Sequence, residues 1–220
     1  MPRIANPERR KKTKKELFQV AARAFLRDGY AATGMKALAA EAGCTTGKFY
    51  CYYSGKEEIL TELMQELFHG NREAAGRLAE RKKDSFYGVL IFLSTLYQGA
   101  QEYPNLREIY REGILEPAGG EFLEGILSEM LSAEGQSAGE LLRIRIAIQA
   151  IPVFFREDTA ADATEEQYLT LLAQILGKQP EDAEAYTKLV TGNKTAVREK
   201  AYDVLIKLLQ GPKKKNVKKM

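Results

Sequence analysis

The sequence predicts an all-α protein in which a small N-terminal three-helix domain precedes a larger helical bundle. From residue 13 to residue 209, apolar residues recur at spacings of three and four, as on one face of an α-helix. The segments between them contain glycine or proline, and no stretch shows the alternation of a half-buried strand. With 220 residues, of which 45% are hydrophobic, the chain is long enough to bury a substantial core.

The first helix is expected to begin at Thr13. Residues 1–12 carry two prolines and no apolar periodicity, which is typical of a flexible basic arm. Thr13 and Glu16 have the spacing of a capping box, in which a hydroxyl and a carboxylate satisfy free amides at a helix start. Apolar residues follow at helical spacing, and Gly29 supplies a stop, so this helix should span about four turns.

Two short helices come next. Thr33 can cap a second helix that ends before Gly43, and Thr45 can cap a third that runs to Tyr53. Phe49 and Tyr53 lie one turn apart and should both face inward. Two short helices joined by a glycine-containing turn form a helix-turn-helix, whose second helix has the width of the DNA major groove.

A fourth, longer helix is expected to open at a second capping box formed by Ser54 and Glu57. Pro152 should bend or split one of the later helices, because it lacks an amide donor and clashes with the preceding turn. The remaining helical segments are predicted at 84–103, 104–115, 121–133, 138–156, 164–176, 181–189 and 195–209.

The charge is distributed unevenly along the chain. Residues 1–56 hold 12 Lys and Arg against 4 Asp and Glu, a net +8, whereas the remainder holds 21 against 26, a net −5. An excess of this size at one end is expected of a segment that binds phosphates. Residues 211–220 add five lysines without an apolar pattern, which predicts a disordered basic tail that either reinforces DNA binding or only aids solubility.

Four short stretches carry a resemblance to a known family: GYAAT at 29–33, LAAEAG at 38–43, GKFYCYY at 47–53 and KEEIL at 56–60. In this order they resemble the TetR/AcrR family of helix-turn-helix transcriptional regulators. The resemblance covers about residues 10–65, and the rest resembles the family only in being helical. We therefore expect a flexible arm at 1–12, the helix-turn-helix domain at 13–58, the helical bundle at 59–210 and the tail at 211–220.

The resemblance implies roles for individual residues of the N-terminal domain. Threonine and tyrosine can meet base edges or donate to phosphates, and lysine near a helix start adds its charge to free amides. Base edges are expected to be read by Thr46, Gly47 and Tyr52, and phosphates to be bound by Thr33, Thr45, Lys48, Tyr50 and Lys56. Because positions 46, 48, 51 and 52 depart from the commonest family pattern, the operator sequence stays open.

The resemblance also implies a repressor that a small-molecule effector releases from a double-stranded DNA operator, working as a homodimer. With no apolar run of membrane-span length and no uninterrupted secretory signal, the chain is expected to stay in the cytoplasm. The helical bundle would then bind the effector and hold the dimer together, and the fourth helix would couple it to the DNA-binding domain. The dimer helices are expected to be 138–156 with either the segment from Thr164 or that from Thr195. The candidate pocket residues, chosen from the apolar and aromatic positions of the bundle, are Phe86, Leu90, Tyr97, Tyr110, Phe122, Ile126 and Tyr168.

Other functions find less support in the sequence. No cluster of catalytic side chains with specific spacing occurs, so we expect no enzyme, no metal and no cofactor apart from the unknown effector. No apolar run reaches the length of a membrane span. Cys44 and Cys51 are interpreted as small buried residues, with a redox switch as the alternative. The alternative to a sequence-specific regulator is a helical interaction module whose basic end binds nucleic acid without sequence choice.

Overall fold

All regular structure in the described part of the chain is α-helical, which confirms the all-α prediction. The computed structural model describes residues 7–80, 82, 84–131, 137–156 and 163–210. The elements are α1 (Pro7–Asp28), α2 (Met35–Glu41), α3 (Thr46–Tyr50), α4 (Lys56–Ala79), α5 (Ser85–Glu102), α6 (Pro104–Leu115), α7 (Pro117–Leu131), α8 (Ala138–Phe154), α10 (Glu165–Ile175), α11 (Pro180–Thr191) and α12 (Lys194–Gln210). Residues 1–6 of the expected arm and the expected tail at 211–220 lie outside the described residues.

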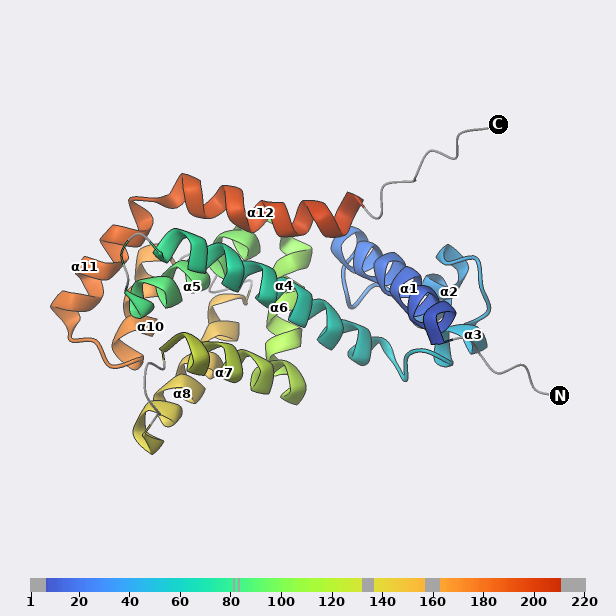
Figure 1. The fold of residues 1–220 in the computed structure, drawn as a ribbon, viewed down its shortest axis with the longest axis horizontal. Helices are drawn as coiled ribbons and strands as arrows, with labels where there is room; N and C mark the ends of the chain where they lie inside the picture. The colour runs from blue at the N-terminus through green and yellow to red at the C-terminus, as the bar shows by residue number, and fades with distance from the viewer. Residues whose placement is uncertain (1–6, 81, 83, 132–136, 157–162, 211–220) are drawn as a thin grey trace.

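The first three helices form a small unit, here called the head, at one end of the molecule (Figure 1). Phe25, Leu38 and Phe49, one from each of its helices, are fully buried and give the head its own core. α2 and α3 contact each other across a turn in which Gly43 has φ +62°, a conformation that suits glycine. The head is therefore built as the expected helix-turn-helix.

The start of α1 differs from the sequence-based expectation. The helix begins at Pro7 and includes Thr13 in its interior, so half of the expected arm is helical and the Thr13 capping box does not open the helix. Proline is well suited to a first helical position because no amide donor is needed there. Glu8 follows it favourably at the positive end of the helix dipole, and four strong helix formers at 9–12 carry the helix onward.

The caps of α3 and α4 agree with the expectation in part. The Thr45 hydroxyl accepts a hydrogen bond from the Lys48 amide at 3.1 Å, which confirms Thr45 as the N-cap of α3. At the start of α4, Ser54 pairs with Glu58 and not with Glu57: the Ser54 amide donates to the Glu58 carboxylate at 2.8 Å. The Glu58 carboxylate reaches back to Ser54, but the N-cap of α4 is Gly55 and no side chain caps this helix, so the expected capping box does not form.

The other helices form a larger bundle, here called the body, around α5. Every residue of α5 from Phe86 to Ala100 is buried, because α4, α6, α7, α10, α11 and α12 all contact it. α4 runs from the head into the body, and α12 lies across α4 and α5 and touches α1 (Figure 1). The head is thus attached to the body through α4, α6 and α12.

The later helices lie close to their expected positions. α6 has the expected bounds, while α7 begins at Pro117, four residues before the expected start, again with proline at the first position. Thr164 opens α10 with a capping box to Gln167. Pro152 does not split α8: it lies in the last turn, and the helix ends two residues later at Phe154.

Candidate nucleic-acid interface and effector site

α3 is held in the head by one face and exposes the other. Phe49 is fully buried and its ring lies 5.9 Å from that of Tyr53, so both aromatics face inward as predicted. Gly47, Lys48 and Tyr50 are exposed, with 51% of Tyr50 accessible to solvent. About half of the Tyr50 side chain is therefore accessible to an external partner.

Tyr52 is only half-buried and lies against the start of α1. The guanidinium of Arg10 is 5.4 Å from the centroid of the Tyr52 ring and donates to the carbonyl of Cys51 at 3.1 Å. Arg10 belongs to the stretch that was expected to be a flexible arm, so sequence reasoning missed this contact. The run of helix formers after Pro7 is the signal that could have revealed it.

Three of the expected phosphate-binding residues have intramolecular partners: Thr45 through the cap described above, and Thr33 and Lys56. Thr33 is 4% exposed and its hydroxyl donates to the carbonyl of Gly29 at 2.7 Å, and it does not cap α2, whose N-cap is Gly34. The burial of Thr33 argues against a phosphate contact through its side chain. The Lys56 ammonium donates to the Tyr30 carbonyl at 3.3 Å and lies 4.3 Å from the centroid of the Tyr30 ring. Lys56 is only half-buried at the start of α4, so part of its side chain remains accessible.

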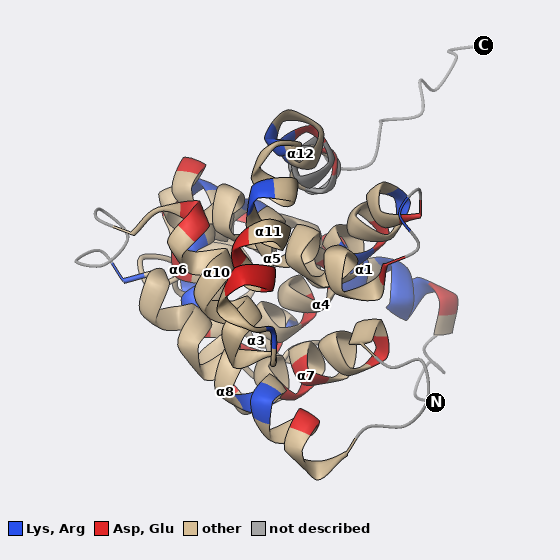
Figure 2. Cartoon of the chain, turned by 90° about the vertical axis from the view of Figure 1, so that its left-hand side faces the viewer, with Lys and Arg blue, Asp and Glu red and all other residues tan. Residues whose placement is uncertain are grey.

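Positive charge collects at the start of α1, where residues 9–12 are all basic and exposed. Figure 2 shows this stretch as a continuous run of blue near the N-terminus, whereas blue and red are interspersed over the body. Lys14, further along α1, is paired with Glu58 and Glu62 at 3.5 and 3.1 Å. The exposed cations at 9–12 thus add to Lys48, the one cation of α3.

The cysteine prediction is wrong for one of the two residues. Cys44 is half-buried and packs against the core, whereas Cys51 is exposed and its thiol donates to the Gly47 carbonyl at 3.3 Å. Its position directly after the short α3 places it at the surface.

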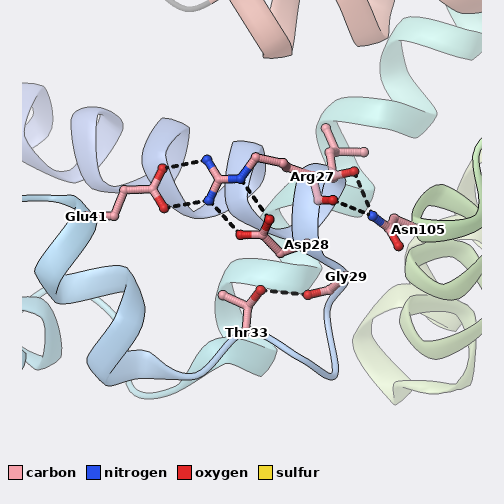
Figure 3. A network of polar contacts seen from close by, with 7 residues as sticks. Arg27, Asp28, Gly29, Thr33, Glu41 and Asn105 are labelled. Atoms are coloured by element: carbon pink, nitrogen blue, oxygen red, sulfur yellow. Dashed lines mark hydrogen bonds and ion pairs between the residues drawn. The ribbon is translucent and has the colours of Figure 1, made fainter.

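The end of α1 is fixed to α2 by a network of charges (Figure 3). Arg27 bridges Asp28, at 2.6 Å, and Glu41 of α2, at 2.9 Å. The hydrogen bond to Asp28 is the main cause that raises the pKa of Arg27, and the same guanidinium holds the pKa values of Asp28 and Glu41 below their usual range. The network therefore links the end of α1 to the end of α2.

α6 holds the same end of α1 from the side of the body. The Asn105 amide donates to the carbonyls of Leu26 and Arg27, at 3.1 and 2.9 Å, as drawn in Figure 3. The Glu108 carboxylate accepts from the backbone amides of Tyr30 and Ala31 at 2.9 and 3.1 Å. A side chain at position 29 would meet Glu108, and the backbone there has φ +95°, so glycine is required at this close approach.

Some of the expected pocket residues meet in an aromatic cluster in the body. Tyr97 and Tyr110 both reach the ring pair Phe155 and Tyr168: the Tyr97 and Tyr168 centroids are 5.0 Å apart, and those of Tyr110 and Phe155 are 6.1 Å apart. Phe68 stacks on both Tyr110 and Phe122 and extends the cluster. Phe86 instead packs on Tyr186, at 5.2 Å, while Leu90 and Ile126 are buried in the surrounding core.

Polar side chains buried beside this cluster were not anticipated from the sequence. Glu165, 7% exposed, accepts hydrogen bonds from Ser94 and from the Gln98 amide, the latter at 2.9 Å, and lies 3.6 Å from the Lys194 ammonium. The Asn71 amide donates to the Tyr110 hydroxyl at 3.1 Å. Glu165 directly follows the N-cap of α10, and only tertiary packing against α5 turns that first helical position inward.

Two hollows open on the surface beside the cluster. One of about 840 Å³ lies between the end of α8, α10 and α11, and its lining includes Phe154, Ala163 and Leu171. A second of about 520 Å³ is lined by Glu165 and Lys194, and both hollows include Glu166. The lining of these hollows includes none of the expected pocket residues, because those residues fill the core behind them.

A stripe of apolar side chains is exposed on α8. Leu142, Ile146 and Val153 are 58%, 49% and 50% exposed, and their spacings of four and seven place them on one face of the helix. α10, which contacts α8, exposes Leu171. Exposed apolar residues aligned in this way are typical of a surface that another protein covers.

Within the described ranges, no group of three or more His, Cys, Asp or Glu residues is placed to hold a metal ion. None of the helices described is long and apolar enough to cross a membrane.

Comparisons with known proteins agree on the class of fold. Residues 17–63 match the family model of bacterial regulatory proteins, tetR family. The structure of RolR bound to resorcinol superposes with a TM-score of 0.68 at 16% identity, over 83% of this chain and 96% of that one. Unliganded RolR gives a TM-score of 0.58 at 15% identity, over 79% and 95%. No curated protein matches the chain in sequence.

Proposed function

We propose that this chain, a TetR-family protein by the match of its residues 17–63, is a DNA-binding repressor that a small molecule releases from its operator. The observation that carries the proposal is the architecture of the head. α3 is anchored by Phe49 and turns Gly47, Lys48 and Tyr50 outward, beside the basic first turns of α1. An exposed helix flanked by cations is suited to the major groove of DNA.

In this proposal the contacts divide into two classes. Lys48, Tyr50 and Lys56 bind phosphates, together with the exposed cations at the start of α1, which sequence reasoning had not placed. Thr46, Gly47 and Tyr52 face base edges, with Tyr52 oriented by Arg10. The Thr45 hydroxyl caps α3 by accepting from the Lys48 amide, and its own O–H would donate to a phosphate oxygen.

The body would bind the effector at the aromatic cluster. Aromatic walls with a few buried polar groups are typical of sites for small organic molecules. RolR, which shares the fold, is known as a complex with resorcinol, a small aromatic compound, and this supports an aromatic effector here. We propose no metal or other cofactor and no catalytic role for these residues.

The protein would act in the cytoplasm as a homodimer, through α8 and α10. The stripe of Leu142, Ile146 and Val153 on α8 and Leu171 on α10 would be buried in a four-helix bundle made by two copies. α12 is less suited to this role, since it lies across α4 and α5 and reaches the head. A two-fold dimer would present two heads to successive major grooves.

The test is binding of the purified full-length chain to the DNA upstream of its own gene, compared with scrambled DNA of equal length, at several salt concentrations. We expect preference for the upstream DNA by about a thousandfold or more. Tyr52→Ala should reduce this preference, whereas Lys188→Ala on the body is the control and should leave it intact. Equal, steeply salt-dependent binding to both DNAs would instead support the alternative of a basic module without sequence choice.

A further inference from the structure

Two buried polar atoms beside the aromatic cluster have no hydrogen-bond partner: the side-chain oxygen of Gln98 and the hydroxyl of Tyr168. Tyr168 is fully buried and Gln98 is 7% exposed. Native proteins pair almost all such groups, because an unpaired group loses its hydration on burial and gains nothing in return. An unpaired donor and an unpaired acceptor in one region therefore indicate a place where another molecule completes the pairing.

The two atoms belong to one cluster through Glu165. Gln98, on α5, donates its amide to Glu165, which leaves the Gln98 oxygen unused. Tyr168 follows Glu165 by one turn of α10. Burial is the main cause that raises the pKa of Tyr168 well above its usual value, and Tyr110, Glu165 and Tyr97 add to it, so the hydroxyl remains a protonated donor.

The surroundings of Tyr168 are aromatic. Tyr97 stacks on its ring at 5.0 Å, and Phe154 meets it edge-on at 5.1 Å. Phe154 also lines the hollow of about 840 Å³, and Glu165 lines that of about 520 Å³. Phe154 thus contacts both the Tyr168 ring and the larger hollow, and Glu165 contacts both the Gln98 amide and the smaller one.

We propose that Gln98 and Tyr168 recognise a neutral phenolic hydroxyl, and that a flat aromatic ring entering from the larger hollow takes the place of Phe154 against Tyr168. A phenolic hydroxyl can supply either missing partner, since its O–H can donate to the Gln98 oxygen and its lone pair can accept from the Tyr168 hydroxyl. An aryl ether lacks the donor, and an aromatic carboxylate brings a negative charge next to Glu165. This inference rests on the proposed function, whose effector it assigns to a chemical class.

The experiment is calorimetric titration of the full-length chain with resorcinol and with 1,3-dimethoxybenzene, which keeps the ring and replaces both hydroxyls by methyl ethers. We expect resorcinol to bind and the diether to bind at least about tenfold more weakly, the loss expected when a buried hydrogen bond cannot form. Tyr168→Phe should weaken resorcinol about tenfold while leaving the unliganded protein as stable to heat as the wild type or more so. Tyr87→Phe, a tyrosine of α5 whose hydroxyl accepts from Asn193, is the matched control and should bind as the wild type does.

Gln98→Leu provides a second variant, with its folding checked by the same thermal melt. The proposal is overturned if the diether binds as well as resorcinol, if neither binds, or if Tyr168→Phe and Gln98→Leu both bind resorcinol unchanged. The DNA assay above is independent of these titrations. Specific DNA binding without phenol binding would overturn only this inference, and phenol binding without specific DNA binding would overturn only the proposed repressor.

Discussion

The carboxylate of Glu108 accepts a hydrogen bond from the backbone amide of Tyr30, 78 positions earlier in the chain, at 2.9 Å. Tyr30 belongs to the loop between α1 and α2, so a side chain of the body holds the backbone of the head. Two residues later, α6 carries Tyr110 into the aromatic cluster. One helix of the body therefore contacts both the proposed effector site and the head, which makes α6, beside the expected α4, a candidate for coupling the two.

Glu108→Ala should loosen this junction. The substitution leaves the amides of Tyr30 and Ala31 without an acceptor, and the loss of a charged acceptor from a part-buried amide costs about 1–3 kcal/mol of unfolding free energy. We expect faster hydrogen exchange at these two amides and a lower midpoint of urea unfolding. Glu121→Ala on α7, an exposed glutamate, is the control. Unchanged exchange at residues 30 and 31 would show that the junction does not depend on this carboxylate.

Lys48 and Tyr50 should contribute to operator binding without contributing to sequence preference. Lys48→Ala is expected to reduce the slope of log K against log salt by about 0.9, because one fewer counterion is displaced from the DNA. Tyr50→Phe, which removes only a hydroxyl, should weaken upstream and scrambled DNA alike by about 1 kcal/mol. Both variants are measured by fluorescence anisotropy at four salt concentrations. A loss confined to the upstream DNA would place Tyr50 at a base edge.

The sequence allowed the fold class, most helix positions and the inward side of α3 to be predicted, because periodicity, caps and glycine stops are local signals. The bounds of α6, the Thr45 cap and the burial of Phe49 illustrate this. The predicted start of α1 at Thr13 is wrong because the helix formers at 9–12 extend the helix beyond the capping-box signal. Two local signals compete in this stretch, the helix start at Pro7 and the capping box at Thr13. The helix that begins at Pro7 continues through Thr13.

The site residues depended more on tertiary contacts and were harder to predict. Thr33 has the sequence position of a helix cap, yet its hydroxyl is turned back to Gly29 and buried. Nothing in the local sequence distinguishes Glu165 or Gln98 from other polar residues, because their contact forms only when α5 and α10 pack together. Aromatic content marked the region of the cluster but could not separate Tyr97, Tyr110 and Tyr168 from Phe86, because which rings meet depends on helix packing.

Glu58 should make the stability of the protein depend on pH in the acid range. Hydrogen bonds from Ser54, led by its backbone amide, and the charge of Lys14 hold the pKa of Glu58 below its usual value. A carboxyl whose pKa is lower in the folded state stabilises the fold above its unfolded pKa of about 4.3, and that stabilisation is lost as the pH falls through the folded pKa.

Glu58→Gln should therefore lose less unfolding free energy than the wild type between about pH 7 and about pH 3. Urea unfolding followed by circular dichroism at both pH values measures the difference. Glu57→Gln, an exposed neighbour that does not pair with Ser54, should behave as the wild type does. An acid loss in Glu58→Gln equal to that of the wild type would contradict the assignment.

The exposed stripe on α8 should hold two copies together. Ile146 lies between Leu142 and Val153 on one face, and a carboxylate placed there would be buried without a partner in a four-helix interface. Ile146→Glu is expected to raise the dimer dissociation constant by about 100-fold or more, since burying an unpaired charge costs several kcal/mol.

Sedimentation equilibrium measures the change, and thermal melts check that the monomer stays folded. Ile206→Glu, at an isoleucine 45% exposed on α12, is the matched control and should remain dimeric. Because two linked heads bind a two-fold site more tightly than one, Ile146→Glu should also weaken binding to the upstream DNA, and a monomeric wild type would contradict both expectations.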